Sequence, residues 1–226
     1  MNSLEYEMIE LLKVLKEKYG VFEIKAEYEN EGSRQAELMR LKDVAEKLDL
    51  PIILKIGGVE AVTDIYNALA LGVKGIIAPM AETGFAASKF LNAIDTFVPE
   101  DNQKDIEFAI NIETITAYKN LDEILSLKKL KLLTSLTVGR VDFGGSLGAD
   151  RSFSNSDEML KYCSEIFQKA KSKNLKTALG GAIATEAIPF IKKLNSDKLI
   201  DKYETRKLVF HKDAIKNIDE GLPIGV

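Results

Sequence analysis

Residues 51–78 read PIILKIGGVEAVTDIYNALALGVKGIIA, and this stretch decides the fold. It holds a short apolar run at 51–55, a helix-forming segment at 59–71 and a second apolar run at 75–78. In the middle segment apolar residues recur at the spacing of an amphipathic helix, and Gly72 follows as a helix stop. A strand, a helix and a second strand with short connections predict a βαβ unit with parallel strands.

The same alternation continues on both sides of this unit. Seven apolar or β-branched runs predict strands: Val21–Ala26, Pro51–Lys55, Gly75–Ala78, Ile106–Ile112, Leu133–Gly139, Leu175–Leu179 and Lys207–Phe210. An eighth strand is expected near Leu199–Lys202. Helical periodicity fills the intervals, at Ser33–Leu48, Val59–Leu71, Ala86–Phe97, Ile115–Leu127, Ser156–Lys171, Thr185–Leu194 and Lys212–Glu220. A further amphipathic helix, at about residues 3–19, precedes the first strand.

Serial strand–helix units without a Pro/Gly/Ser-rich linker predict one domain over residues 1–226. Seven or eight such units favour a closed (β/α)8 TIM barrel over an open doubly wound sheet, and the chain length fits this fold. No G-x-G-x-x-G motif follows the first strand, which argues against a dinucleotide-binding domain. The expected fold class is therefore α/β, with a single barrel.

Composition excludes several function classes. One cysteine, Cys163, and one histidine, His211, leave no intramolecular disulfide, no Cys-rich zinc site and no multi-His metal site. The net charge of −4 predicts no nucleic-acid partner. No apolar run reaches the roughly 18 residues of a membrane span, and the acidic first helix lacks the pattern of a signal or transit peptide. We therefore expect a cytoplasmic protein without a membrane partner.

The active site of a TIM barrel lies at the C-terminal ends of its strands. Charged residues collect after these ends in this sequence: Lys25, Glu27, Glu29 and Arg34 after the first strand, Lys55 after the second, Glu113 after the fourth, and Arg140 and Asp142 after the fifth. Because a barrel strand has no free edge, the alternating charges of the first strand are expected to point into the barrel mouth. Carboxylates that meet without His or Cys suit a hard cation, so we predict Mg²⁺ or Mn²⁺ as the cofactor.

Each of these residues also has a purely structural interpretation. Glu113 can complement a helix dipole, Asp142 can cap the turn before Gly144, and Lys55 can be an ordinary ion-pair partner. The segment from Gly144 and Gly145 to Gly148 lacks a P-loop lysine, but its backbone amides can hold a carboxylate or phosphate.

Three segments carry a resemblance to a known family: GVKGIIAPMAET at 72–83, NIET at 111–114 and VGRVDF at 138–143. In order and spacing they resemble the HpcH/HpaI aldolase and citrate lyase beta family, from about residue 20 to about residue 185. The resemblance implies a (β/α)8 barrel of the phosphoenolpyruvate/pyruvate-binding superfamily. It also implies that Glu113 and Asp142 hold a divalent metal.

In this family the metal chelates a 2-oxo acid through its carboxylate and keto oxygens and stabilises the enolate formed as a C–C bond breaks or forms. The sequence departs from the pattern twice. Lys55 replaces an arginine, and the stretch from Glu27 to Gly32 lacks the histidine of the aldolases. We therefore expect Lys55 to polarise the developing enolate, and Glu27 or Glu29 to move protons if burial raises the carboxyl pKa toward neutrality.

The remaining expected contacts serve the substrate, a small-molecule carboxylate. Lys25, Arg34, Arg140, Gly144 and Gly145 are the predicted substrate-binding residues, with Arg34 or Arg140 holding a remote acid group. The resemblance further implies a homo-oligomer, because related barrels pack their C-terminal helices against neighbours.

The leading hypothesis is a divalent-metal-dependent carbon–carbon lyase or aldolase acting on a 2-oxo acid or related carboxylate. One alternative is a condensing enzyme, acyl-CoA lyase or thioesterase of the same family. Another is a metal-independent aldolase that forms a Schiff base on Lys25 or Lys55. The last alternative is a non-catalytic barrel that binds a metabolite.

Overall fold

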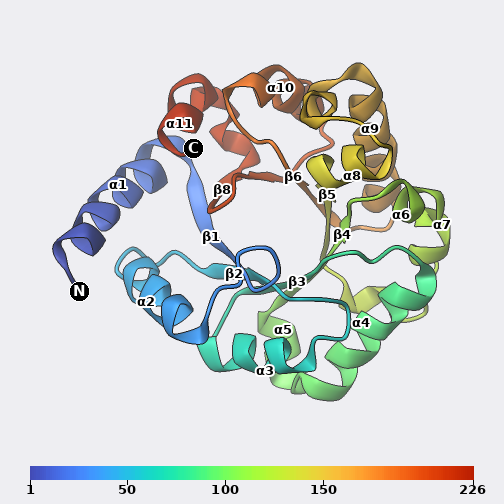
Figure 1. The fold of residues 1–226 in the computed structure, drawn as a ribbon, viewed down its shortest axis with the longest axis horizontal. Coiled ribbons are helices and arrows are strands. Elements are labelled where there is room, and N and C mark those ends of the chain that lie inside the picture. Colours follow the sequence, from blue (N-terminus) through green and yellow to red (C-terminus); the bar gives the residue numbers. More distant parts are fainter.

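The computed structural model describes all residues 1–226, and its eight strands close into a barrel (Figure 1). The strands are β1 (Val21–Glu27), β2 (Ile52–Lys55), β3 (Gly75–Ala78), β4 (Glu107–Ile112), β5 (Ser135–Gly139), β6 (Lys176–Gly180), β7 (Lys202–Glu204) and β8 (Leu208–His211). They follow one another around the barrel in chain order. The predicted closed eight-stranded α/β barrel is therefore confirmed, and the strand expected near Leu199–Lys202 is β7.

Helices surround the barrel on the outside (Figure 1). The longer ones are α1 (Ser3–Tyr19), α2 (Gln35–Glu46), α3 (Val62–Leu71), α4 (Gly84–Phe97), α9 (Asp157–Ser172) and α10 (Ile188–Ser196). The shorter ones are α5 (Glu100–Asp105), α6 (Ile115–Lys119), α7 (Leu121–Ile124), α8 (Arg140–Ser146) and α11 (Ile218–Ile224), with 3₁₀ turns η1 (Leu130–Leu132), η2 (Arg151–Asn155), η3 (Thr185–Ala187) and η4 (Lys212–Asn217). As predicted, α3 stops at Gly72, which takes up the left-handed conformation with φ of 69°. None of these helices combines the length and the apolar character required to cross a membrane.

The last strand of the barrel departs from the regular alternation of parallel strands and helices. Strands β1 to β7 run parallel, but β8 is antiparallel to both of its neighbours, β7 and β1. Only residues 205–207 separate β7 from β8, and so short a link allows a hairpin but no crossover helix. The hairpin turn consequently lies at the C-terminal end of the barrel, where it adds residues to the mouth.

The apolar core lies between the strands and the helices, while the inside of the barrel is largely polar. Only Ile53, Ile77, Ala109 and Val209 form a separate small apolar cluster. Below it, Lys202 Nζ is 2.8 Å from Glu23 Oε2 in a buried ion pair. This pair lies at the N-terminal end of the barrel, and the larger open space is at the opposite, C-terminal end.

Candidate active site

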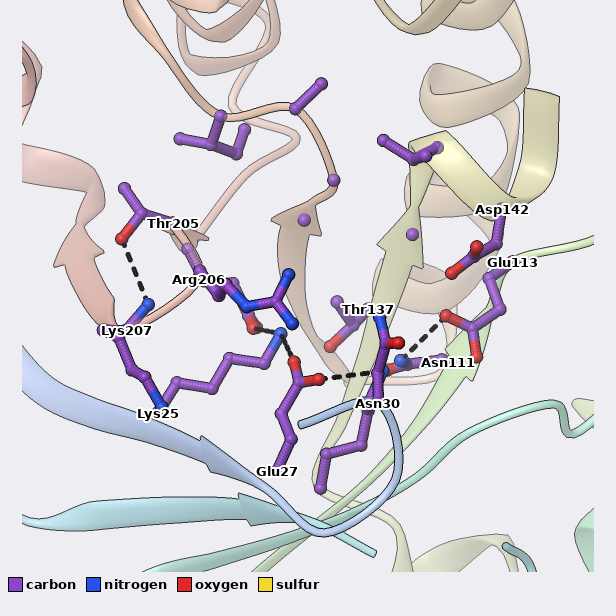
Figure 2. A pocket seen from close by; sticks show the side chains of 18 of the residues that line it. Lys25, Glu27, Asn30, Asn111, Glu113, Thr137, Asp142, Thr205, Arg206 and Lys207 are labelled. Carbon is purple, nitrogen blue, oxygen red and sulfur yellow. Dashed lines mark hydrogen bonds and ion pairs between the residues drawn. The ribbon is translucent and has the colours of Figure 1, made fainter. Parts of the chain in front are cut away.

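A pocket of about 410 Å³ opens at the C-terminal ends of the strands, a volume suited to a small molecule. Five predicted site residues line it: Lys25, Glu27, Lys55, Glu113 and Asp142. Figure 2 shows Lys25, Arg206 and Lys207 on one side and the carboxylates of Glu113 and Asp142 on the other. The pocket thus has a basic side and an acidic side.

The acidic side is built around Glu113, which directly follows β4. Its side chain is fixed by two hydrogen bonds: the Met80 N–H donates to Oε1 at 3.0 Å, and Asn111 Nδ2 donates to Oε2 at 3.1 Å. Glu113 is only 2% exposed, and burial raises the pKa of its carboxyl, with the nearby charge of Asp142 acting in the same direction. Two neighbouring carboxylates with no cation in direct contact suit a divalent ion, which would relieve both the burial and the repulsion.

The number of carboxylates at this place also suits Mg²⁺ or Mn²⁺. No group of three or more His, Cys, Asp or Glu side chains in the structure is arranged to hold a metal ion. Mg²⁺ commonly binds through one or two carboxylates and keeps its other positions for water and substrate oxygens. Glu113 and Asp142 can therefore supply the protein ligands of such an ion.

Gly139, the last residue of β5, makes room for the Glu113 side chain. A Cβ at Gly139 would lie 2.7 Å from Glu113 Oε2 and 2.9 Å from Glu113 Cβ, closer than atoms can pack. We expect Gly139→Ala to displace the carboxylate, weaken Mg²⁺ binding at least about tenfold and cost about 1–3 kcal/mol of stability. Calorimetry and thermal unfolding measure the two effects.

Gly145→Ala is the matched control, because nothing lies within 4 Å of the added Cβ in α8. We expect this variant to bind Mg²⁺ like the wild type. Equal Mg²⁺ affinity in the two variants would show that Glu113 does not need the space beside Gly139.

Opposite Glu113 runs an ion-pair chain of five residues: Glu204, Lys25, Glu27, Lys55 and Glu29. All of them except Glu29 line the pocket. Lys25 Nζ lies 2.7 Å from Glu204 Oε2 and 3.2 Å from Glu27 Oε1. Lys55 Nζ lies 2.6 Å from Glu29 Oε2 and 3.6 Å from Glu27 Oε2. Each lysine is therefore held between two carboxylates.

This arrangement sets the charges of the lysines and of Glu27. Burial works against the charged lysines, but the neighbouring carboxylates outweigh it and raise the pKa of both Lys25 and Lys55. Burial likewise opposes the charge of Glu27, but Lys25 and Lys55 hold the pKa of its carboxyl below the usual value. Proton transfer by Glu27 would require the opposite shift, so its place in the structure fits orientation of the two lysines.

Four predicted substrate-binding residues lie outside the pocket. Arg34 precedes α2, and its 81% exposed side chain pairs with Glu37 at 2.7 Å. Arg140 is fully buried behind the pocket wall, where its guanidinium donates to loop oxygens. Gly144 and Gly145 belong to α8 and do not line the pocket. The direct contacts expected from these residues are therefore not available in this structure.

Charged residues that were not predicted line the pocket instead. Arg206 and Lys207 extend from the β7–β8 turn, and both pair with Glu31. Glu204 ends β7, and Arg151 opens η2 at the rim. The apolar run at 207–210 looks like one more parallel strand, whose first residues would lie at the far end of the barrel, so the sequence pattern does not place this turn at the mouth. The short spacing between the last two predicted strands was the available signal for a hairpin.

Comparisons with known proteins agree with this architecture. The model of the HpcH/HpaI aldolase/citrate lyase family matches residues 41–186, a range that includes Lys55, Glu113 and Asp142. A search of curated proteins finds no match. Among solved structures, citrate synthase SbnG has a TM-score of 0.68 at 16% identity, over 86% of this chain and 89% of that one.

Two further solved structures share the fold. The HpcH/HpaI aldolase from Desulfitobacterium hafniense DCB-2 has a TM-score of 0.61 at 14% identity, over 77% of this chain and 73% of that one. The citrate lyase beta subunit from M. tuberculosis, complexed with oxaloacetate and magnesium, has a TM-score of 0.55 at 13% identity, over 88% and 85% of the two chains. At such identities the likeness extends to the fold alone.

Proposed function

Because the chain belongs to the HpcH/HpaI aldolase/citrate lyase family, we propose that it is a divalent-metal-dependent carbon–carbon lyase or aldolase for a 2-oxo acid or related carboxylate. The observation that carries the proposal is the buried carboxylate of Glu113 beside Asp142. The two carboxylates share one pocket with the cationic side chains of Lys25, Lys55, Arg206 and Lys207. A citrate lyase beta subunit of the same fold is complexed with oxaloacetate and magnesium, which supports the choice of metal and substrate class.

In this proposal Glu113 and Asp142 hold Mg²⁺ or Mn²⁺. The bound ion would supply Lewis-acid polarisation of the substrate's carboxylate and keto oxygens and would stabilise enolate charge. Lys55 adds a fixed positive charge, because Glu27 and Glu29 orient its ammonium group and Glu113 is close enough to raise its pKa. As a compact point charge, Lys55 can attract a developing enolate oxygen without the bidentate geometry of an arginine.

Glu29 is the better candidate of the two glutamates for moving protons. Its carboxylate contacts only one lysine, Lys55. Glu29 lies just outside the lining of the pocket, and its 29% exposed side chain can exchange protons with solvent. Glu27, by contrast, lies between two lysines with its pKa lowered. We therefore assign proton transfer to Glu29 and orientation of the lysines to Glu27.

Exchange of the pyruvate methyl protons in D₂O tests the proposal without knowledge of the natural substrate. If the site forms an enolate, NMR will show loss of the methyl signal with enzyme and Mg²⁺, and EDTA will stop it. Arg34→Ala is the matched control and should exchange at the wild-type rate, since Arg34 lies on the surface. Exchange that continues unchanged in EDTA would refute the metal-dependent mechanism.

The Schiff-base alternative predicts a different result. A Schiff base needs a neutral amine, but Lys25 and Lys55 are both ion-paired and their pKa values are raised. We expect borohydride, added with pyruvate and EDTA, to leave the protein mass unchanged in mass spectrometry. A trapped adduct on either lysine would instead support a metal-independent aldolase.

A further inference from the structure

Arg140 is a buried cation with no carboxylate partner. Its guanidinium carbon lies 4.5 Å from the centre of the Phe190 ring, and the side chain is fully buried. All its hydrogen bonds go to neutral oxygens of two segments beside the pocket: Gly180 O at 3.3 Å, Gly181 O at 2.7 Å, Ala182 O at 3.1 Å, Ser154 O at 2.7 Å and Asn155 Oδ1 at 2.8 Å. Because a buried charge needs these bonds, the guanidinium fixes the direction of the carbonyl groups.

The fixed carbonyls determine where the next N–H groups point. All peptide bonds are trans, so each carbonyl and the following N–H point in opposite directions. The N–H groups of Gly181, Ala182 and Ile183 therefore turn away from Arg140. These three residues line the pocket while Arg140 does not, and none of the three N–H groups donates to a backbone carbonyl.

The backbone of this loop is held in a conformation that non-glycine residues rarely adopt. Gly181 has φ of 72° and Ala182 has φ of 52°, so two successive residues are left-handed. This conformation is strained for an alanine, and such strain persists only where the surroundings enforce it, often at binding sites. Here the enforcing contact is the guanidinium of Arg140.

We propose that the N–H groups of Gly181, Ala182 and Ile183 form a second carboxylate site in the pocket, with Arg140 as its positioning residue. Successive N–H groups that point to one side form an anion-binding concavity. Arg151 adds positive charge at the same rim, on the η2 segment that Arg140 also anchors through Ser154 and Asn155. The inference rests on the proposed function and narrows the substrate to a 2-oxo acid that carries a second carboxylate.

The site is tested first by binding alone, in EDTA, so that no metal or turnover is involved. The probe is malonate, titrated into ¹⁵N-labelled protein while the amide signals are followed by NMR. We expect saturable shifts of the Gly181, Ala182 and Ile183 signals. Scattered shifts without saturation, or shifts confined to other residues, would refute the site in the wild-type protein itself.

Two glycine variants sharpen this experiment. At Gly181 a Cβ would lie 2.7 Å from Val141 N and 2.8 Å from Arg140 N, whereas at Gly180 the nearest atom is 3.6 Å away. Gly181→Ala should weaken malonate binding about 10- to 100-fold, the loss of one or two hydrogen bonds to a charged group, while Gly180→Ala binds normally. Equal binding by both variants would contradict the proposal.

Kinetics then separate this inference from the proposed function. In the Arg140→Lys variant we expect the KM for the cleavage of oxaloacetate to rise about tenfold or more, because oxaloacetate carries a second carboxylate. KM for pyruvate in the deuterium-exchange assay should stay unchanged, because pyruvate has no second carboxylate. An equal rise for both substrates would show a merely structural Arg140, whereas absent exchange in the wild type would refute the proposed function itself.

Discussion

Replacing Lys25 by methionine is expected to lower the free energy of unfolding by about 3–5 kcal/mol. Lys25 Nζ lies 2.7 Å from Glu204 Oε2, and Glu204 is only 1% exposed. Without the ammonium group, the Glu204 carboxylate would be a buried charge with no cation in contact. Methionine fills a similar volume, so the loss reflects charge and not a cavity. Urea denaturation followed by circular dichroism measures the change.

Two controls isolate this effect. Glu204→Gln in the Lys25→Met background should recover much of the lost stability, because the uncompensated charge disappears. Lys169→Met removes the exposed ion pair with Asp122 and should cost no more than about 1 kcal/mol. If Lys25→Met were no more harmful than Lys169→Met, the ion-pair chain would not support the barrel mouth.

The second large effect concerns the carboxylate pair. We expect Glu113→Gln and Asp142→Asn each to weaken Mg²⁺ binding by about 100-fold or more, since even residues that only support a metal ligand commonly contribute 10- to 100-fold. Either change removes a formal negative charge while keeping the shape of the side chain. Pyruvate proton exchange should fall to the background rate. Calorimetry gives the affinity, and NMR gives the exchange rate.

Asp157→Asn is the matched control for these variants. Asp157 is an acid in the first turn of α9, as Asp142 is in α8, but it lies outside the pocket. It should leave Mg²⁺ affinity unchanged, and thermal unfolding should show that all three variants are folded. Retained Mg²⁺ affinity in both Glu113→Gln and Asp142→Asn would refute the assignment of the metal site.

Much of the fold could be predicted because local signals repeat along the chain. Each strand–helix unit is indicated by local signals: the helical periodicity, a stop such as Gly72 and the spacing of the apolar runs. The strands of these units close into the eight-stranded barrel. The direction of β8 could not be predicted from the same signals. An apolar run looks alike in both directions, and only the short link at 205–207 decides the reversal.

In the candidate site, too, some residues could be predicted from the sequence and others could not. Glu113 directly follows β4 and Asp142 lies in the first turn after β5, so the direction of each strand places them at the mouth of the barrel. Arg140 occupies an equivalent position, but its long side chain is directed by carbonyl groups about forty residues further along the chain. The partner of Lys25, Glu204, comes from a strand near the other end of the sequence. Partners this far apart in the sequence cannot be predicted from the local periodicity.

Calorimetric titration of the metal-free protein with Mg²⁺ and Mn²⁺, with and without oxalate, tests the central claim most directly. Oxalate offers the two adjacent oxygens of a 2-oxo acid but cannot react. We predict that oxalate binds far more tightly with the metal than in EDTA, where only the N–H groups of Gly181, Ala182 and Ile183 can hold it, and that Glu113→Gln abolishes metal binding and this gain in affinity. Oxalate binding of equal strength in EDTA would contradict the metal site and would direct attention to the lysines of the ion-pair chain.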